Sequence, residues 1–132
     1  MIFIPKEPRK VGLLAGKFYP CPQKHVCVST QSDEHDAKHY IKPLKYNSKE
    51  EAMEKILKII ESFRRTKLVK KEENYIHAVF ITALFRFKDD VEFYFDDVEK
   101  IIHFKSQSRI GGYDWNANRN RMEKIRKVYL TS

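Results

Sequence analysis

The chain contains few of the residues that interrupt or cross-link a fold: four glycines, five prolines and two cysteines in 132 residues. So few glycines and prolines argue against low-complexity linkers. No stretch approaches the ~20 apolar residues of a membrane-spanning helix, and the opening segment Met1–Lys6 has too short an apolar run for a signal peptide. The sequence therefore predicts a soluble, cytoplasmic protein, in which the two cysteines are expected as thiols rather than as a disulfide.

What the chain does contain is typical of a globular domain. Hydrophobic residues make up 42% and charged residues 33%, which supplies a core and excludes a disordered chain. Because the length is close to the commonest domain size, we expect a single domain over residues 1–132.

Positive charge is in excess, with a formal net charge of +8, and such an excess can attract nucleic acid or a membrane surface. The charge is not spread evenly, because residues 85–99 are acidic and residues 100–132 are basic. Adjacent blocks of opposite sign can pair with each other inside the fold. The distribution therefore argues against nucleic acid as the partner, and the oligomeric state stays open.

Two helices are predicted. Ser48 and Glu51 form a capping box, and apolar residues at helical spacing follow as far as Phe63, which predicts a helix over 48–65. A second helix is expected over 114–130, with Asp114 or Asn116 as its capping residue. The apolar face of this second helix consists of Met122, Ile125, Val128 and Tyr129.

Between the helices, over residues 67–110, apolar residues alternate with polar ones as in half-buried strands. Strands are expected at 67–72, 75–82, 85–87, 91–95 and 101–109. In the last strand the residues expected on one face are Ile102, Phe104, Ser106 and Ser108. The alternating Phe and Tyr residues of these strands are expected in the core.

Residues 1–46 are expected to be loop-rich, with weak strands at 11–14 and 39–42 and a loop over 15–36. The order of elements predicts an α+β fold. Its single antiparallel sheet is a meander of about four to six strands, with the two helices packed on one face.

Three carboxylates lie within four residues, at Asp89, Asp90 and Glu92. Clustered carboxylates can serve acid–base catalysis or bind a hard cation. The alternative, which we favour, is that they cap a turn and form ion pairs with the basic final helix.

Residues 106–121 form the most polar segment, with hydroxyls, three arginines and three asparagines around Gly111 and Gly112. A turn that enters a helix presents free backbone amides, and nearby guanidinium groups would complete a pocket for a carboxylate or phosphate. The segment lacks the P-loop pattern. The alternative is a buried polar network, in which Arg109 pairs with Asp89 or Asp90.

Cys21, His25, Cys27, His35 and His39 lie within 19 positions, and thiols and imidazoles are zinc ligands. The spacing lacks the usual C-x₂-C pattern, which argues against a zinc site. Cys27 with His39 as a nucleophile pair is a further hypothesis. Its alternative is that Cys27 is simply a small buried apolar residue.

Several of these residues resemble the widespread bacterial and plastid family known as domain of unknown function 1499. The matching pieces are Cys21-Pro22, Cys27 to Gln31, His39 to Tyr46, Phe87 to Phe93, Ser106 to Gly111, Asp114, and Asn118-Arg119 with Arg121. The chain departs from the family pattern at Lys105, where the family has Arg, at Ala117, where it has Gly, and at His25-Val26, where it has Pro-Asn. The resemblance implies a compact α+β domain and brings no established activity.

The leading hypothesis is a non-enzymatic binding module for a small anionic ligand or an anionic peptide group, without a cofactor or a metal. The residues expected to bind it are Ser106, Ser108, Arg109, Asn118 and Arg121, and those expected to orient the arginines are Asp89, Asp90 and Glu92. This hypothesis expects Arg109 and Arg121 to converge on an open concavity, whereas a structural role expects both to be buried and paired.

Two other classes stay open. One is an enzyme that uses Cys27 as a reactive thiol or uses the three carboxylates. The other is a scaffold or protein-interaction domain without a ligand pocket.

Overall fold

A computed structural model describes residues 10–132 of the chain. The segment Met1–Lys6, on which the expectation about a signal peptide depends, lies outside the described residues. Within residues 10–132, neither helix has the length and apolar character that a membrane crossing requires.

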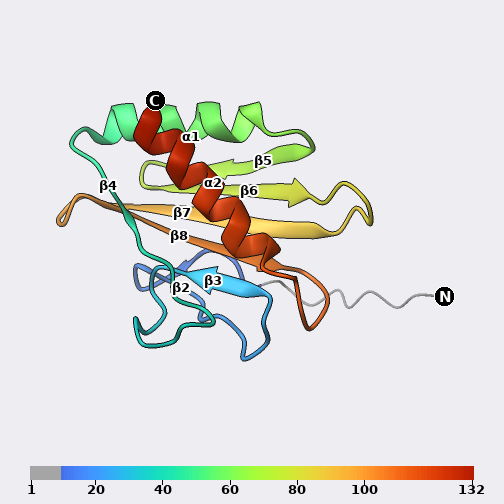
Figure 1. The fold of residues 1–132 in the computed structure, drawn as a ribbon. Coiled ribbons are helices and arrows are strands. Elements are labelled where there is room, and N and C mark those ends of the chain that lie inside the picture. The colour runs from blue at the N-terminus through green and yellow to red at the C-terminus, as the bar shows by residue number, and fades with distance from the viewer. Residues whose placement is uncertain (1–9) are drawn as a thin grey trace.

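A six-stranded antiparallel sheet forms the centre of the described part of the chain (Figure 1). Its strands are β3 (Cys27–Ser29), β4 (Leu44–Lys45), β5 (Thr66–Lys71), β6 (Tyr75–Ile81), β7 (Lys88–Asp96) and β8 (Ile101–Ser108). The spatial order is β3-β8-β7-β6-β5, and β4 also pairs with β8, so β5 to β8 form the predicted meander. A separate hairpin of β1 (Leu13–Leu14) and β2 (Lys17–Phe18) precedes the sheet.

Both helices pack on one face of this sheet. Helix α1 (Lys49–Ser62) lies on the β5 side, and α2 (Ala117–Thr131) crosses diagonally in front of the strands toward α1 (Figure 1). Buried side chains of both helices share one apolar cluster with Phe93, Phe95 and Phe104 of the sheet. The predicted α+β fold, with one antiparallel sheet and two helices on one face, is confirmed.

Helix α1 begins where the capping pattern places it. The Ser48 hydroxyl accepts a hydrogen bond from the Glu51 amide at 3.3 Å, which satisfies one of the free amides of the first turn. The helix ends at Ser62, before the predicted end near Arg65, because Phe63 is already extended and Arg65 has a left-handed φ of 58°. The Arg65 carbonyl then accepts from the Ile81 amide, at the start of the β5–β6 pairing.

The structure corrects three strand predictions. Residues 85–87 belong to a loop over 82–87, because Arg86 has a left-handed φ of 56° and Thr82 holds the Phe87 amide with its side chain. Residues 39–42 contribute only an isolated bridge between Ser29 and Tyr40. The predicted loop over 15–36 contains β2 and β3, and β3 is too short to show an alternating pattern.

Alternation along β7 divides its side chains between two faces of the sheet. The register pairs Asp89 with Ser108 on the face that the helices cover, which we call the helix face. It pairs Asp90 with Gln107, and Glu92 with its neighbour on β8, on the opposite face, which we call the second face. Segment 10–21 lies over the second face, because the Gly12 amide donates to Glu92 Oε1 at 2.7 Å.

Candidate functional site

Asn118, in the first turn of α2, is the centre of a polar network on the helix face. Its side chain is fully buried, and Nδ2 donates to Val26 O, Ser108 Oγ and Asp114 Oδ2 at 3.1, 2.9 and 2.7 Å. Its Oδ1 accepts from Ser106 Oγ at 2.7 Å. One amide thus connects β8, the chain before β3 and the start of α2, so it fixes how the final helix enters the fold.

Arg121 completes this network and supplies its positive charge. Its Nη1 donates to Ser106 Oγ and Asn118 Oδ1, each at 3.0 Å, and its Nη2 donates to Asp89 Oδ2 at 2.6 Å. The guanidinium also lies over the Phe80 ring, 5.2 Å from its centroid. Asp89 Oδ1 has no hydrogen-bond partner in the described part of the chain, so this buried carboxylate depends on Arg121.

Asp114 determines where α2 begins. Its Oδ1 accepts from the Asn116 amide at 2.9 Å, and its Oδ2 accepts from the Asn118 amide at 3.2 Å. Trp115 and Asn116 both have positive φ, so the helix starts at Ala117 rather than at 114. Of the two predicted capping residues, Asp114 satisfies the free amides and the Asn116 side chain does not.

The second face holds a separate ion pair. Arg109 donates from Nε to Asp90 Oδ2 and from Nη2 to Asp90 Oδ1, both at 3.0 Å, and His77 Nε2 lies 2.8 Å from the same Oδ1. Burial acts to raise the pKa of Asp90, but hydrogen bonds from His77 and Arg109 outweigh it and lower the pKa to about 2. This carboxylate is therefore ionised at neutral pH and holds the guanidinium in a fixed plane.

Glu92 orients neither arginine. Its Oε1 accepts from the Tyr75 hydroxyl at 2.6 Å and from the Gly12 amide at 2.7 Å. Beside it, the buried Lys105 ammonium donates to the Tyr19 carbonyl at 2.7 Å, and burial lowers the pKa of this lysine. Both charged groups hold segment 10–21 against the second face.

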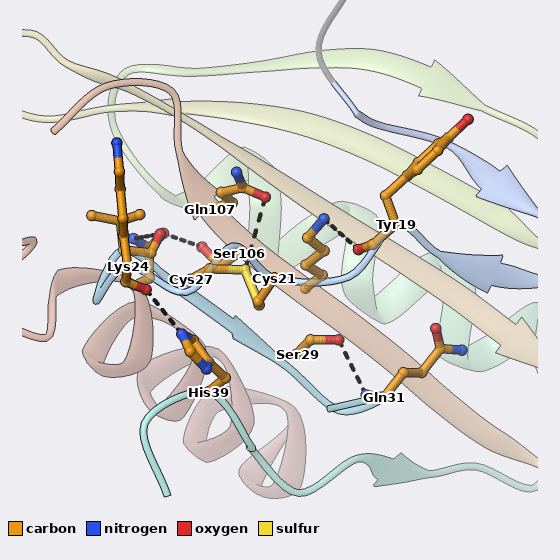
Figure 2. The surroundings of a disulfide bond; sticks show 12 residues. Tyr19, Cys21, Lys24, Cys27, Ser29, Gln31, His39, Ser106 and Gln107 are labelled. Carbon is orange, nitrogen blue, oxygen red and sulfur yellow. Dashed lines mark hydrogen bonds between the residues drawn. A yellow bond between two sulfur atoms is a disulfide. The ribbon is translucent and has the colours of Figure 1, made fainter. Parts of the chain in front are cut away.

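The structure corrects the expectation for the two cysteines, because Cys21 and Cys27 form a disulfide. Figure 2 shows this disulfide beside Gln107 of β8, near the chain at Tyr19. The prediction of two free thiols is therefore wrong, and so is the hypothesis of a reactive thiol at Cys27. The disulfide also rules out zinc binding by these cysteines, because zinc and nucleophilic chemistry both require a thiolate.

His39 is not available as a base for Cys27 either. Its Nδ1 lies 2.7 Å from Asp36 Oδ2, and its Nε2 lies 2.9 Å from the Lys24 carbonyl (Figure 2). Both ring nitrogens are thus occupied, and they join the chain that follows β3 to the loop before it.

The predicted binding residues separate into two groups. Ser106, Ser108, Asn118 and Arg121 meet Asp89 on the helix face, whereas Arg109 meets Asp90 on the second face. Arg109 and Arg121 therefore point to opposite sides of the sheet and do not converge. The alternation of β7 could have predicted this separation, because adjacent residues of a strand face opposite ways.

Two surface hollows among residues 10–132 lie away from all five residues. One, of about 330 Å³, lies between α1 and β5 and is lined by Leu57, Phe63 and Arg65 among others. The other, of about 210 Å³, lies at the start of α1 beside Tyr46 and Tyr129.

Sequence reasoning missed a group of exposed apolar side chains at one end of the sheet. Loops 82–87 and 109–116 leave the sheet together there, because the Arg109 amide donates to the Lys88 carbonyl at 3.1 Å (Figure 1). The exposed residues, which we call the aromatic end, are Leu84, Phe85, Phe87, Ile110, Tyr113 and Trp115. Alternation in 85–87 wrongly placed two of these rings in the core, and Trp115 next to a Gly-Gly turn was a signal that could have found the rest.

The rings of the aromatic end pack in pairs within each of the two loops. Phe85 and Phe87 stack with centroids 5.4 Å apart, and Tyr113 packs edge-on against Trp115 at 5.2 Å. His25 stacks on Tyr113 at 4.9 Å, which ties loop 109–116 to the chain before β3. Trp115 nevertheless remains 79% exposed.

A compact α+β domain with two buried polar networks is thus the class that fold and geometry define. The chain belongs to the family described as Protein of unknown function (DUF1499), whose model matches residues 17–128. No curated protein matches the chain. The match covers both networks, and the family description names no activity.

Proposed function

We propose that this protein is a non-enzymatic binding module, and that it recognises an acidic peptide segment of a partner protein at the aromatic end. The observation that carries the proposal is the group of six large apolar side chains exposed on two adjacent loops. Large apolar side chains that are exposed together on neighbouring loops mark interaction surfaces, whereas single ones are common anywhere on a protein.

The charge around the aromatic end favours an acidic partner. Arg86 and Lys88 are exposed in and beside loop 82–87. The only carboxylate of loop 109–116 belongs to Asp114, whose side chain is 7% exposed and faces inward. The surface therefore presents aromatic rings and positive charge, and a peptide with acidic and apolar side chains complements both.

Arg109 is the residue among the five predicted ones that we retain as a direct contact. Its side chain is 20% exposed at the root of loop 109–116, and Asp90 fixes its plane through Nε and Nη2. Its Nη1 donates no hydrogen bond to residues 10–132 and is free to donate to a peptide carboxylate. Ser106, Ser108, Asn118 and Arg121 support the loop from the helix face.

The shape of the surface favours a peptide over a small ligand, because neither hollow is lined by these residues and small molecules need enclosure. A peptide is also favoured over a lipid surface. A guanidinium held in one plane recognises a carboxylate of fixed direction, which a peptide offers and a fluid bilayer does not.

Selection of random displayed peptides on the purified chain tests the proposal. We expect the selected peptides to be rich in Asp and Glu next to Leu or Phe. Their dissociation constants should rise at least about tenfold with Trp115→Ala, because an exposed aromatic anchor is lost, and similarly with Arg109→Lys, because the planar fork is lost. Leu130→Ala, at an exposed apolar position of α2, is the matched control and should leave binding unchanged.

Melting temperatures of all three variants show whether a loss of binding reflects a loss of folding. The proposal is wrong if no acidic peptides are enriched, or if Trp115→Ala binds them as well as the wild type does. Binding of phosphatidylserine vesicles, without any selected peptide, would identify a lipid surface instead and would also overturn it.

A further inference from the structure

A second group of chemistry-bearing residues lies at the other end of the sheet, where β7 turns into β8. Asp96 at the end of β7, Glu99 in the turn and His103 on β8 have ligand atoms that all lie within 4.8 Å of one another. The register explains the approach, because Tyr94 pairs with His103 and Asp96 follows Tyr94 on the same face. Asp96 and His103 are therefore diagonal neighbours on the second face.

The imidazole of His103 is held in a fixed orientation. Its Nδ1 lies 2.8 Å from Thr30 Oγ1, and its ring stacks on Tyr94 with an angle of 11° between the planes. When Nδ1 donates its proton to Thr30, the lone pair is on Nε2. Histidine ligands of metals are commonly oriented in this way by a hydrogen bond at the other ring nitrogen.

The Asp96 carboxylate is also fixed, and only in part occupied. Its Oδ1 accepts from the amides of Val98 and Glu99 at 3.0 and 3.2 Å, and no residue of the described range donates to its Oδ2. The neighbouring Asp97 is different, because it is held by the Tyr46 hydroxyl and by Lys49. Asp97 is therefore not part of the group.

Within residues 10–132, neither Asp96 nor Glu99 forms an ion pair with a basic side chain, although the chain as a whole carries a net charge of +8. Two carboxylates and an imidazole that lie this close together suit a metal cation better than a lysine ammonium, because a small ion can contact all three groups at once.

We infer that Asp96, Glu99 and His103 bind one divalent transition-metal ion. One nitrogen and two oxygen ligands suit Zn²⁺, Co²⁺ or Mn²⁺ better than Mg²⁺ or Ca²⁺, which favour oxygen ligands alone. The bound ion would join the turn to both strands and, through Thr30, to the chain that follows β3.

Calorimetric titration of the purified chain with Zn²⁺ tests this inference. We expect one ion per chain, with affinity at least about tenfold weaker in His103→Gln and in Glu99→Gln, since each variant removes one ligand. Glu99 is exposed and makes no side-chain hydrogen bond in the described range, so Glu99→Gln should fold as the wild type does. The matched controls are His35→Gln and Glu34→Gln, which change the same residue types in an exposed loop and should leave affinity unchanged.

Two further measurements use the same proteins. Zn²⁺ should raise the melting temperature of the wild type and not that of Glu99→Gln. Mg²⁺ and Ca²⁺ should not displace it. The inference is overturned if Zn²⁺ fails to bind, if Glu99→Gln and His103→Gln bind it as tightly as the wild type, or if His35→Gln is the variant that loses it.

Discussion

Asp89 and Asp90 are adjacent on one strand and have opposite surroundings. Asp89 points to the helix face, where Arg121 holds one of its oxygens and the other has no partner in the described part of the chain. Asp90 points to the second face, where Arg109 and His77 hold both of its oxygens. The buried Asp89 carboxylate therefore depends on one arginine, whereas the Asp90 carboxylate has two hydrogen-bonding side chains.

The networks around Asp89 and Asp90 also connect different parts of the fold. The Asp89 network includes Asn118 and Arg121 of α2, so it docks a helix onto the sheet. The Asp90 network joins β6, β7 and the end of β8, which backbone hydrogen bonds already hold together. We therefore expect the helix-face network to contribute more to the free energy of unfolding than the second-face network.

The largest effect is expected for Arg121→Ala. Removal of the guanidinium leaves the buried Asp89 carboxylate without a hydrogen-bond donor, which should lower the free energy of unfolding by about 3–5 kcal/mol. Denaturation by urea measures this loss.

Arg119→Ala, two positions earlier in the same helix, is the matched control. Within residues 10–132, Arg119 donates only to the exposed carbonyls of Ala37 and Lys38, so its loss should cost under about 1 kcal/mol. If Arg119→Ala and Arg121→Ala lowered the free energy of unfolding by similar amounts, the stabilising role assigned to the helix-face network would be contradicted.

Removal of the disulfide by Cys21→Ala with Cys27→Ala should lower stability by about 2–3 kcal/mol, because the cross-link closes a short loop in the unfolded chain. Hydrogen exchange should show where the loss is felt. We expect faster exchange at Gly12 and in the strands under segment 10–21, and little change at the Asn118 amide. Uniform acceleration over both faces would show that the faces are not independent.

The smallest effect is expected for the protonation of Asp90 in acid, which should lower the free energy of unfolding by about 2 kcal/mol. Its pKa of about 2 in the folded chain is below the ordinary value of 3.8. The stabilisation is therefore fully present above about pH 4 and is lost as pH falls toward 2.

Urea denaturation at several pH values compares the wild type with Asp90→Asn, which lacks the titrating group. The variant should lose less stability between pH 4 and 2 than the wild type does, whereas Glu61→Gln, at an exposed position of α1, should behave as the wild type. Equal pH slopes for Asp90→Asn and the wild type would rule out Asp90 as the origin of the acid sensitivity.

Local patterns explain why much of the fold could be predicted. The spacing of Ile56, Ile59 and Ile60 and the cap at Ser48 act within one helix, so they are readable without knowledge of the rest. The prediction that Phe85 and Phe87 lie in the core was wrong because burial is not a local property. Alternation indicates burial only where a neighbouring strand and a core are present. A short loop with two exposed rings has the same pattern.

The prediction of free thiols at Cys21 and Cys27 was wrong for a different reason. Disulfide formation requires two Cα atoms at bonding separation, and here they are 5.7 Å apart because the loop between Cys21 and Cys27 folds back on β3. Composition and the expected compartment carry no information about that path.

The sequence by itself determined the helices, the meander and the concentration of polar residues near the final strand–helix turn, because each depends on residues close together in the chain. Only the tertiary structure decided that Arg121 pairs with Asp89 and Arg109 with Asp90. Those pairings depend on strand register and on the path of α2 over the sheet, and both are set by the packing of side chains that are distant in sequence.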